Sequence, residues 1–333
     1  MSSIRSTVAN GVGEIVLDRP SALNALDQSM IDDMFQVLQE WGDDDAVELV
    51  LVTSSSPRAF CAGGDIRAIR EHALAGDAEA ITRYFAGEYR LNQLIAEYPK
   101  PYVALIDGAA MGGGLGISVH GEIRVVTDKA LIAMPETAIG FFPDVGATYF
   151  LPRLPDGVGL WLGLTGARIG GADALAVGLA THYVASEQLP AVAERIRSGA
   201  PLIEVLGDLP PAPGSELPLD KIAGYFELDC APSTIIGGLS GSADEWAQEM
   251  LDLLSAASPT SLAVTGELIA AGAHSSLGQC LERELHAAEV ITAGHDFAEG
   301  VRSVLVDKDR NPAFEPDRLD DVDGALVRRI VGD

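Results

Sequence analysis

Residues 101–117 have the sequence PYVALIDGAAMGGGLGI, an apolar run followed by a glycine-rich turn. The run over 101–106 predicts a buried β-strand, and the glycines after it predict a turn that opens a helix. Residues 60–65 (FCAGGD) follow the apolar run 47–53 in the same way. Because strand, glycine turn and helix recur, we expect an α/β fold with a layer of parallel strands.

Hydrophobic patterns outside these segments extend the architecture. Asn10-Gly11 is a turn signal inside residues 8–17, so a strand or hairpin is expected there. Further patterns predict a strand over 122–127 and helices over 30–41, 66–75, 81–98, 262–270, 277–291 and 297–305. Strand signals fade after about residue 185. We therefore expect a core domain over 1–185 and a mostly helical region over 186–333.

Composition excludes several classes of protein. The chain has 333 residues, of which 47% are hydrophobic and 21% charged, as in ordinary soluble globular proteins. Its 22 basic and 49 acidic residues give a net charge of -27, which argues against binding nucleic acid or an anionic membrane. Apolar runs are too short for a membrane span, and the first residues lack a signal-peptide pattern. Three widely spaced cysteines predict no disulfide framework, so we expect a cytoplasmic protein.

The glycine segments match no familiar phosphate-binding motif. No Gly-Lys pair occurs, which excludes a P-loop, and residues 112–117 lack the last glycine of the dinucleotide fingerprint. No G-x-S-x-G motif and no H-E-x-x-H motif occurs. Backbone N–H groups at two strand-to-helix turns could instead form an oxyanion hole, and glycine would let a ligand approach them. The alternative is that these glycines serve tight turns and close packing.

Carboxylates in an apolar segment form a second candidate site. Glu136 and Asp144 bracket a stretch that contains Phe141 and Phe142, and such surroundings raise carboxyl pKa values toward the range useful for acid–base catalysis. The alternative is structural: Asp144 as the N-cap of a helix over 145–151, and Glu136 in a first helical turn. A third acid, Glu88, interrupts a stripe that otherwise predicts burial, although an edge position is the commoner explanation.

Taken together, these segments resemble the crotonase (enoyl-CoA hydratase/isomerase) superfamily. The resemblance rests on residues 17–26, 60–67, 111–120 and 134–145, and continues through 150–154, 164–166, 258–262 and 300–302. It implies a spiral core of repeated ββα units and a mostly helical C-terminal region that covers an acyl-CoA pocket. It also implies an acyl-CoA thioester as ligand. Coenzyme A would be part of the substrate, with no further cofactor and no metal.

The resemblance assigns roles residue by residue. The backbone N–H groups of Gly64 and Gly113 would form the oxyanion hole. Glu136 matches the main catalytic carboxylate, Asp144 the second acid, and Glu88 an acid that contacts substrate. Gly113, Glu136 and Asp144 would contact the substrate as well.

One departure from the hydratases bears on the reaction. Where they carry a first catalytic glutamate after the glycine run, this chain has Gly116. The resemblance therefore implies hydrolysis of a short β-hydroxyacyl-CoA thioester, with 3-hydroxyisobutyryl-CoA of valine catabolism as the expected substrate. The alternatives are an enoyl-CoA hydratase or isomerase, and an inactive acyl-CoA-binding relative.

A second departure concerns the coenzyme A phosphates. Many family members carry a lysine where this chain has Ser21, so Arg19, Arg58 and Arg67 are the nearby candidates to replace it. Hydratases commonly form trimers or hexamers, and we expect a possible homo-oligomer here, although the longer C-terminal region could occupy the same surface.

Overall fold

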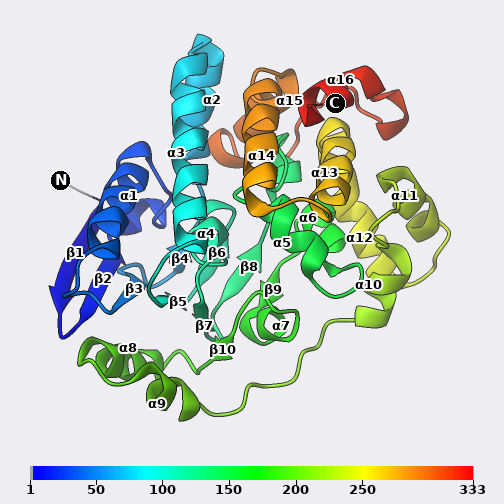
Figure 1. Cartoon of the computed structure of the whole chain (residues 1–333). Coiled ribbons are helices and arrows are strands. Elements are labelled where there is room, and N and C mark those ends of the chain that lie inside the picture. The colour runs from blue at the N-terminus through cyan, green and yellow to red at the C-terminus, as the bar shows by residue number, and fades with distance from the viewer. Residues whose placement is uncertain (1–2, 333) are drawn as a thin grey trace. The chain divides into compact units, whose positions relative to one another are not determined.

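The computed structural model describes residues 3–332, whose helices and strands are labelled in Figure 1. The chain divides into two compact units. Unit one holds the described residues up to Gly64, together with 90–132 and 169–217. Unit two holds 65–89, 133–168 and the described residues from Pro218 onward. This grouping differs from the expected division at residue 185. The chain passes between the units repeatedly, and a change of composition at one boundary cannot reveal that.

A six-stranded sheet with the order β1-β2-β3-β5-β7-β10 forms the centre of unit one. Its strands are β1 (Ile4–Ala9), β2 (Val12–Leu17), β3 (Leu49–Ser54), β5 (Tyr102–Ile106), β7 (Ile123–Val126) and β10 (His182–Tyr183). β1 and β2 form an antiparallel hairpin in which Asn10 and Gly11 adopt φ values of 53° and 79°. The other neighbours pair in parallel. The predicted hairpin and parallel layer are confirmed.

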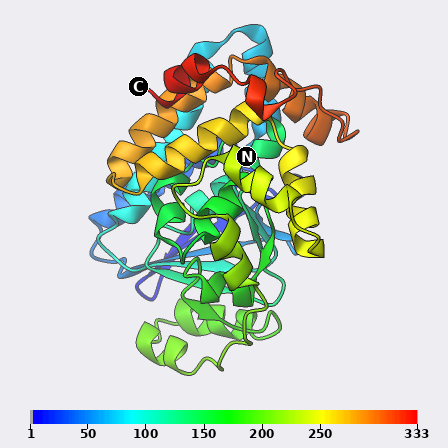
Figure 2. The same ribbon diagram turned by 90° about the vertical axis from the view of Figure 1, so that its right-hand side faces the viewer.

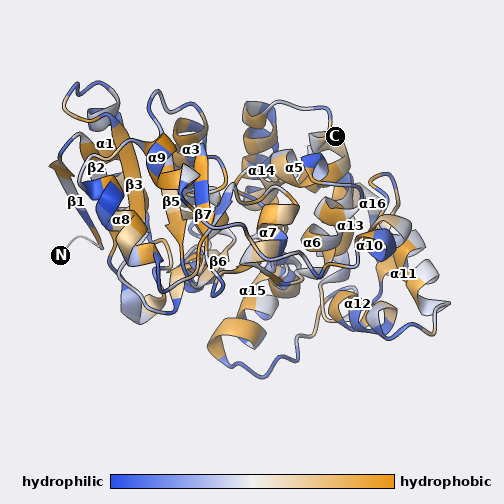
Figure 3. Ribbon diagram, turned by 90° about the horizontal axis from the view of Figure 1, so that it is seen from below, coloured by the Kyte–Doolittle hydropathy of each residue, from blue (hydrophilic) through white to orange (hydrophobic). Residues whose placement is uncertain are grey.

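The central strands are apolar and covered by helices of the same unit. Every residue of β5 is buried, and β3, β5 and β7 are coloured as largely hydrophobic in Figure 3. Residues of α8 (Leu189–Arg197) and α9 (Leu202–Gly207) pack with β3, β5 and β7 in one core cluster. The predicted amphipathic helix is α1 (Gln28–Gly42), and η1 (Pro20–Ala22), α4 (Gly113–Gly116) and α7 (Gly171–Ala176) also belong to this unit.

A second sheet consists of very short strands. Two neighbouring strands of this sheet are each followed by one of the glycine turns. Its order is β4 (Ala59–Cys61), β6 (Ala109–Met111), β8 (Leu131–Ala133) and β9 (Ile169–Gly170). β4 and β6 are parallel neighbours, whereas β8 and β9 are antiparallel. Strands of two or three residues leave no readable periodicity, so the sequence did not predict this sheet.

Unit two is helical, and its C-terminal helices α13, α14 and α16 lie side by side (Figure 2). Its elements are α2 (Ile66–Ala75), η2 (Glu136–Ile139), α5 (Ala147–Phe150), η3 (Leu151–Arg153), α6 (Val158–Thr165), α10 (Leu219–Tyr225), α11 (Pro232–Ser240), α12 (Glu245–Ser255), α13 (Pro259–Gly272), α14 (Leu277–Ile291), α15 (His295–Val301), the π-helix η4 (Arg302–Val306), η5 (Leu319–Asp321) and α16 (Gly324–Val331). α3 (Ala78–Ala96) contributes residues to both units. The predicted helices over 66–75 and 277–291 match α2 and α14.

No single helix within residues 3–332 has the length and hydropathy needed to cross a membrane. In this part of the chain, α12 and α13 taken together reach that length and composition, and they are bent by 106° at their junction.

Candidate active site

The two glycine turns of unit one leave backbone donors without partners. Gly64 lies between β4 and α2, and Gly113 is the first residue of α4 (Gly113–Gly116), directly after β6. Within residues 3–332, neither the Gly64 N–H nor the Gly113 N–H donates a hydrogen bond. Free N–H groups at the start of a helix can donate hydrogen bonds to a negatively charged group.

These two turns lie next to each other because β4 and β6 pair in parallel. A Cβ atom on Gly63 would come within 3.8 Å of the Gly113 nitrogen and 3.1 Å of the Met111 carbonyl oxygen. A Cβ atom on Gly114 would lie 2.2 Å from the Cys61 carbonyl oxygen, so only glycine fits there. The glycines therefore serve close packing, and the same packing brings two unpaired N–H donors into one small region. Such a pair can stabilise a developing oxyanion.

The three acids that the sequence singled out are all buried in unit two. Glu88 is contributed by α3, Glu136 by η2, and Asp144 by the loop that precedes α5. Their exposed fractions are 2%, 7% and 5%. Charged side chains are rarely buried to this extent without a cation beside them. Their charges also act on one another, so the structure brings together the three acids that the sequence predicted as site residues.

Burial and mutual repulsion raise the pKa values of these carboxyls. Burial is the larger cause for Glu136, whose pKa lies well above its usual value, and the charges of Asp144 and Glu88 add to it. The pKa of Glu88 is raised by burial and by Asp144. Burial raises the pKa of Asp144 to about 7, against the opposing hydrogen bond from Tyr89. Groups tuned to this range can exchange protons near neutral pH.

Two of the carboxyls keep an oxygen without a partner. Glu88 Oε1 and Glu136 Oε2 are buried and receive no hydrogen bond within the described part of the chain. Asp144 differs, because its Oδ2 accepts a hydrogen bond of 2.7 Å from the Tyr89 hydroxyl. An unpaired buried oxygen is costly, and it is retained where a ligand or a reacting group is to be bound.

The structure contradicts one alternative and supports another. Asp144 is not the N-cap of a helix over 145–151, since the helix begins only at Ala147 with Gly146 before it. Val145 and Gly146 adopt φ values of 57° and 81°, which cannot continue a right-handed helix. Glu136 does lie in a first helical turn, directly after Pro135. That position does not use up its carboxyl group, because Glu136 Oε2 receives no hydrogen bond within the described residues.

Sequence reasoning missed two side chains that interact with this group. Tyr89 follows Glu88 in the chain, and nothing in its pattern singles it out. Glu284 lies on α14 and is fully buried. It occupies an apolar stripe with Leu281, Ala288 and Ile291, so the argument that identified Glu88 could have identified it too.

Of the three arginines considered for the coenzyme A phosphates, only Arg58 is exposed with its side chain unbonded within residues 3–332. Arg19 donates to the Ala25 carbonyl oxygen at 2.9 Å and pairs with Asp27 at 3.4 Å. Arg67 donates to the Leu305 carbonyl oxygen. Arg58 is therefore the candidate that could bind a phosphate without first breaking a bond within the protein.

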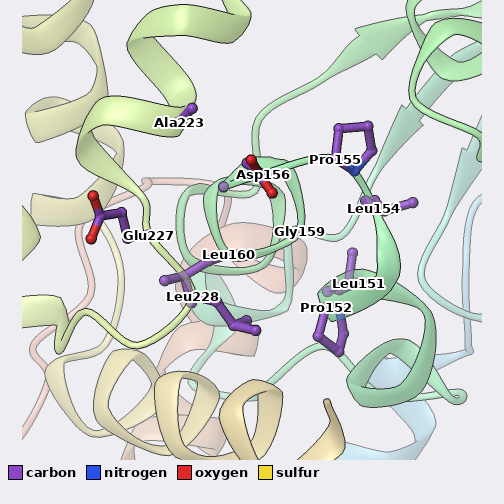
Figure 4. A pocket seen from close by; sticks show the side chains of 11 residues that line it. Leu151, Pro152, Leu154, Pro155, Asp156, Gly159, Leu160, Ala223, Glu227 and Leu228 are labelled. Carbon is purple, nitrogen blue, oxygen red and sulfur yellow. The ribbon is translucent and has the colours of Figure 1, made fainter.

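A surface pocket elsewhere in unit two does not compete as the site. Its volume is about 340 Å³, and it is lined by residues 151, 152, 154–157, 159, 160, 223, 227 and 228 (Figure 4). Asp156 and Glu227 are the charged residues of its lining, which contains no lysine or arginine. An acidic pocket is a poor receptor for a polyanion. Within the described residues, no group of three or more His, Cys, Asp or Glu is arranged to hold a metal ion.

The family follows from comparison with known proteins. The chain matches the model of the enoyl-CoA hydratase/isomerase family over residues 12–331 and belongs to this family, the crotonase superfamily. It is 43% identical to the mitochondrial 3-hydroxyisobutyryl-CoA hydrolase of Xenopus tropicalis, an alignment that covers 95% of this chain and 85% of the relative.

Solved structures agree on the fold. An enoyl-CoA hydratase from Rhodobacter sphaeroides 2.4.1 superposes with a TM-score of 0.93 at 35% identity, covering 99% of this chain and 97% of that one. A carnitinyl-CoA dehydratase from Mycobacterium thermoresistibile also gives a TM-score of 0.93, at 38% identity, covering 99% and 96%. The crotonase fold with a mostly helical C-terminal region is thereby confirmed. The names of these relatives specify different reactions: a hydrolase, a hydratase and a dehydratase.

Proposed function

We propose that this protein is a thioester hydrolase that converts 3-hydroxyisobutyryl-CoA and water into 3-hydroxyisobutyrate and CoA. The observation that carries the proposal is the buried group of Glu88, Glu136 and Asp144, in which two oxygens have no hydrogen-bond partner among residues 3–332. The name of the Xenopus tropicalis relative, which aligns with 95% of this chain, supports the choice of substrate. The route this implies belongs to valine catabolism.

In this mechanism Glu136 is the general base. Its carboxylate takes a proton from water while the water oxygen bonds to the thioester carbonyl carbon. The oxyanion that results is stabilised by the N–H groups of Gly64 and Gly113, a contribution of about 3–4 kcal/mol per donor in other acyl-transfer enzymes. When the C–S bond breaks, the CoA thiolate takes the proton back from Glu136. Direct attack by Glu136 through a mixed anhydride is the second route that these residues allow.

The other two acids orient the reactants. Asp144 accepts the Tyr89 hydroxyl, which fixes its carboxyl group. We assign to Asp144 the orientation of the substrate hydroxyl or of the attacking water, and to Glu88 a further contact with substrate. Glu88 and Asp144 also raise the pKa of Glu136, which makes its carboxylate a stronger base than an exposed glutamate.

A hydratase or isomerase is the second candidate, since two solved relatives carry hydratase and dehydratase names. Gly116 argues against it. This residue lies in α4 and is buried, and it supplies no carboxylate where the hydratases carry their first glutamate. Hydration by two glutamates therefore lacks one partner.

The two candidates are distinguished by what they release. Purified protein is incubated with 3-hydroxyisobutyryl-CoA, 3-hydroxypropionyl-CoA or crotonyl-CoA, and free thiol is measured with a thiol reagent. Hydrolysis predicts rapid thiol release from the hydroxyacyl substrates. Fast loss of crotonyl-CoA without free thiol would reject the hydrolase. A blank without substrate is needed because Cys230 is partly exposed, whereas Cys61 and Cys280 are buried.

A single turnover in ¹⁸O-labelled water separates the two chemical routes. Direct attack by water leaves Glu136 unlabelled, while hydrolysis of a mixed anhydride places label in its carboxyl group. Peptide mass spectrometry of the segment that contains Glu136 reads the difference.

We also keep the cytoplasmic location and a homo-oligomer as proposals. The three cysteines are free, which suits a reducing compartment, whereas the Xenopus relative is named mitochondrial. Cell fractionation and light scattering test the two statements separately.

A further inference from the structure

Glu284 binds the segment that follows Asp144, and the mechanism above does not use it. Its Oε2 accepts the Gly146 N–H at 2.7 Å. Its Oε1 accepts the Thr148 N–H at 3.1 Å and the Thr148 hydroxyl at 2.6 Å. One carboxyl group on α14 therefore accepts three hydrogen bonds from a stretch of three residues, 138 positions earlier in the chain.

The segment that Glu284 holds has a strained backbone. Val145 and Gly146 adopt φ values of 57° and 81° in succession. A β-branched residue is strained in this left-handed region and persists there only where surrounding contacts impose it. The bonds to Gly146 and Thr148 are contacts of that kind, because they fix the backbone directly after Val145.

Both the side chain and the main chain of Asp144 are held by hydrogen bonds. Its carboxyl group accepts the Tyr89 hydroxyl, and its own carbonyl oxygen accepts the Ala147 N–H at 2.9 Å, which closes the turn. Glu284 binds the residues on either side of Ala147. A small movement of this turn would shift the Asp144 backbone and strain its bond to Tyr89.

Both carboxyl oxygens of Glu284 are used as acceptors, and an amide in its place would keep only one acceptor oxygen. Glu284 is fully buried, and within residues 3–332 no lysine or arginine forms an ion pair with it. Burial raises its pKa to about 8, and Asp144 adds to the shift, so the two acids are close enough to repel each other. Such an arrangement lowers stability and is retained at functional sites.

We propose that Glu284 is a positioning residue for the hydrolysis: it fixes the turn over residues 144–148 and so holds the Asp144 carboxyl group in its reactive orientation. This inference rests on the proposed function, since it gives Asp144 a role in the reaction. It predicts that substitution of Glu284 lowers kcat only in a protein that still has the Asp144 carboxyl group.

The test is a double-mutant cycle on the full-length protein. Glu284→Gln and Asp144→Asn are made singly and together, and kcat and KM for 3-hydroxyisobutyryl-CoA are measured at one pH. Glu282→Gln is the matched control, because Glu282 is exposed on the same helix. Thr148→Val is a second variant that removes only the hydroxyl bond to Glu284, and it serves if Glu284→Gln does not fold.

We expect Glu284→Gln to lower kcat by about tenfold or more, as misplacement of a reacting group does elsewhere, and Thr148→Val by less. In the Asp144→Asn background, Glu284→Gln and Thr148→Val should cause no further loss. Losses that multiply in the double variants would overturn the inference and leave the proposed function standing. Wild-type turnover of Asp144→Asn would overturn both the inference and the role of Asp144. No CoA release by the wild type would reject the function itself.

Discussion

Glu136 is the residue on which the proposed chemistry depends most. Its carboxyl group is buried, one oxygen has no partner within the described residues, and its pKa is raised mainly by burial. Glu136→Gln removes the base and also the unfavourable buried charge. We therefore expect kcat to fall by several orders of magnitude while the free energy of unfolding stays level or rises. Thiol-release kinetics and urea denaturation measure the two quantities.

Glu282→Gln is the control: it removes a carboxylate that has no part in the proposed reaction. Glu282 is exposed, so its substitution should change neither quantity. Unchanged turnover in Glu136→Gln would show that the base is a different residue.

The sequence could predict the acids but not their partners. Glu88, Glu136 and Asp144 each interrupt an apolar pattern, and a pattern within one segment is readable from the chain alone. The bonds from Tyr89 to Asp144 and from Gly146 to Glu284 join residues 55 and 138 positions apart. No local property of either segment encodes such a pairing, because it depends on how distant elements pack.

At the scale of elements, glycine lets α15 pack directly on η2, the turn that contains Glu136. A Cβ atom on Gly300 would lie 2.4 Å from the Ile139 carbonyl carbon, and one on Gly140 would lie 2.2 Å from the Asp296 carbonyl oxygen. Both obstacles are backbone atoms, which cannot move aside as a side chain can. We expect Gly300→Ala to destabilise the protein by about 1–3 kcal/mol, the usual cost of overpacking.

Gly237→Ala is the control for that substitution. Gly237 is exposed on α11, and a Cβ atom there would meet nothing within 4 Å. Alanine should leave stability level or raise it, since it favours helix more than glycine does. Thermal melts of both variants give the comparison, and equal melting temperatures would contradict the packing argument.

Elements with a long period were predictable, and short ones were not. The helices over 66–75 and 277–291 have the predicted bounds because an amphipathic stripe repeats over several turns. β4 and β6 have three residues each, too few for a pattern, although they carry the two glycine turns. The prediction of a helix directly after Asp144 was wrong, because Val145 adopts a left-handed conformation that its residue type disfavours.

At the scale of the whole molecule, buried acids make stability depend on pH. The pKa of Asp144 is raised to about 7 and that of Glu284 to about 8, both chiefly by burial. Between the unfolded pKa values near 4 and these folded values, the folded state binds more protons than the unfolded state. The free energy of unfolding should therefore fall as pH rises from 5.5 to 8, by up to about 1.4 kcal/mol per pH unit for each group.

Urea denaturation at several pH values tests this sign. The slope should be shallower in Asp144→Asn and unchanged in Glu282→Gln. The net charge of -27 acts in the same direction as pH rises, so the difference between variants is the informative quantity. An equal slope in wild type and Asp144→Asn would show that Asp144 titrates as an exposed aspartate does.

The unpaired donors at Gly64 and Gly113 belong to the main chain. Exchanging a side chain cannot delete a main-chain N–H, unless the new residue is proline. Mutation can misplace these donors but seldom remove them, whereas a carboxyl group is lost through a single codon change. Divergence in this fold should therefore keep the glycine turns and vary the acids, and a chain that retains only the turns says nothing about whether it still catalyses a reaction.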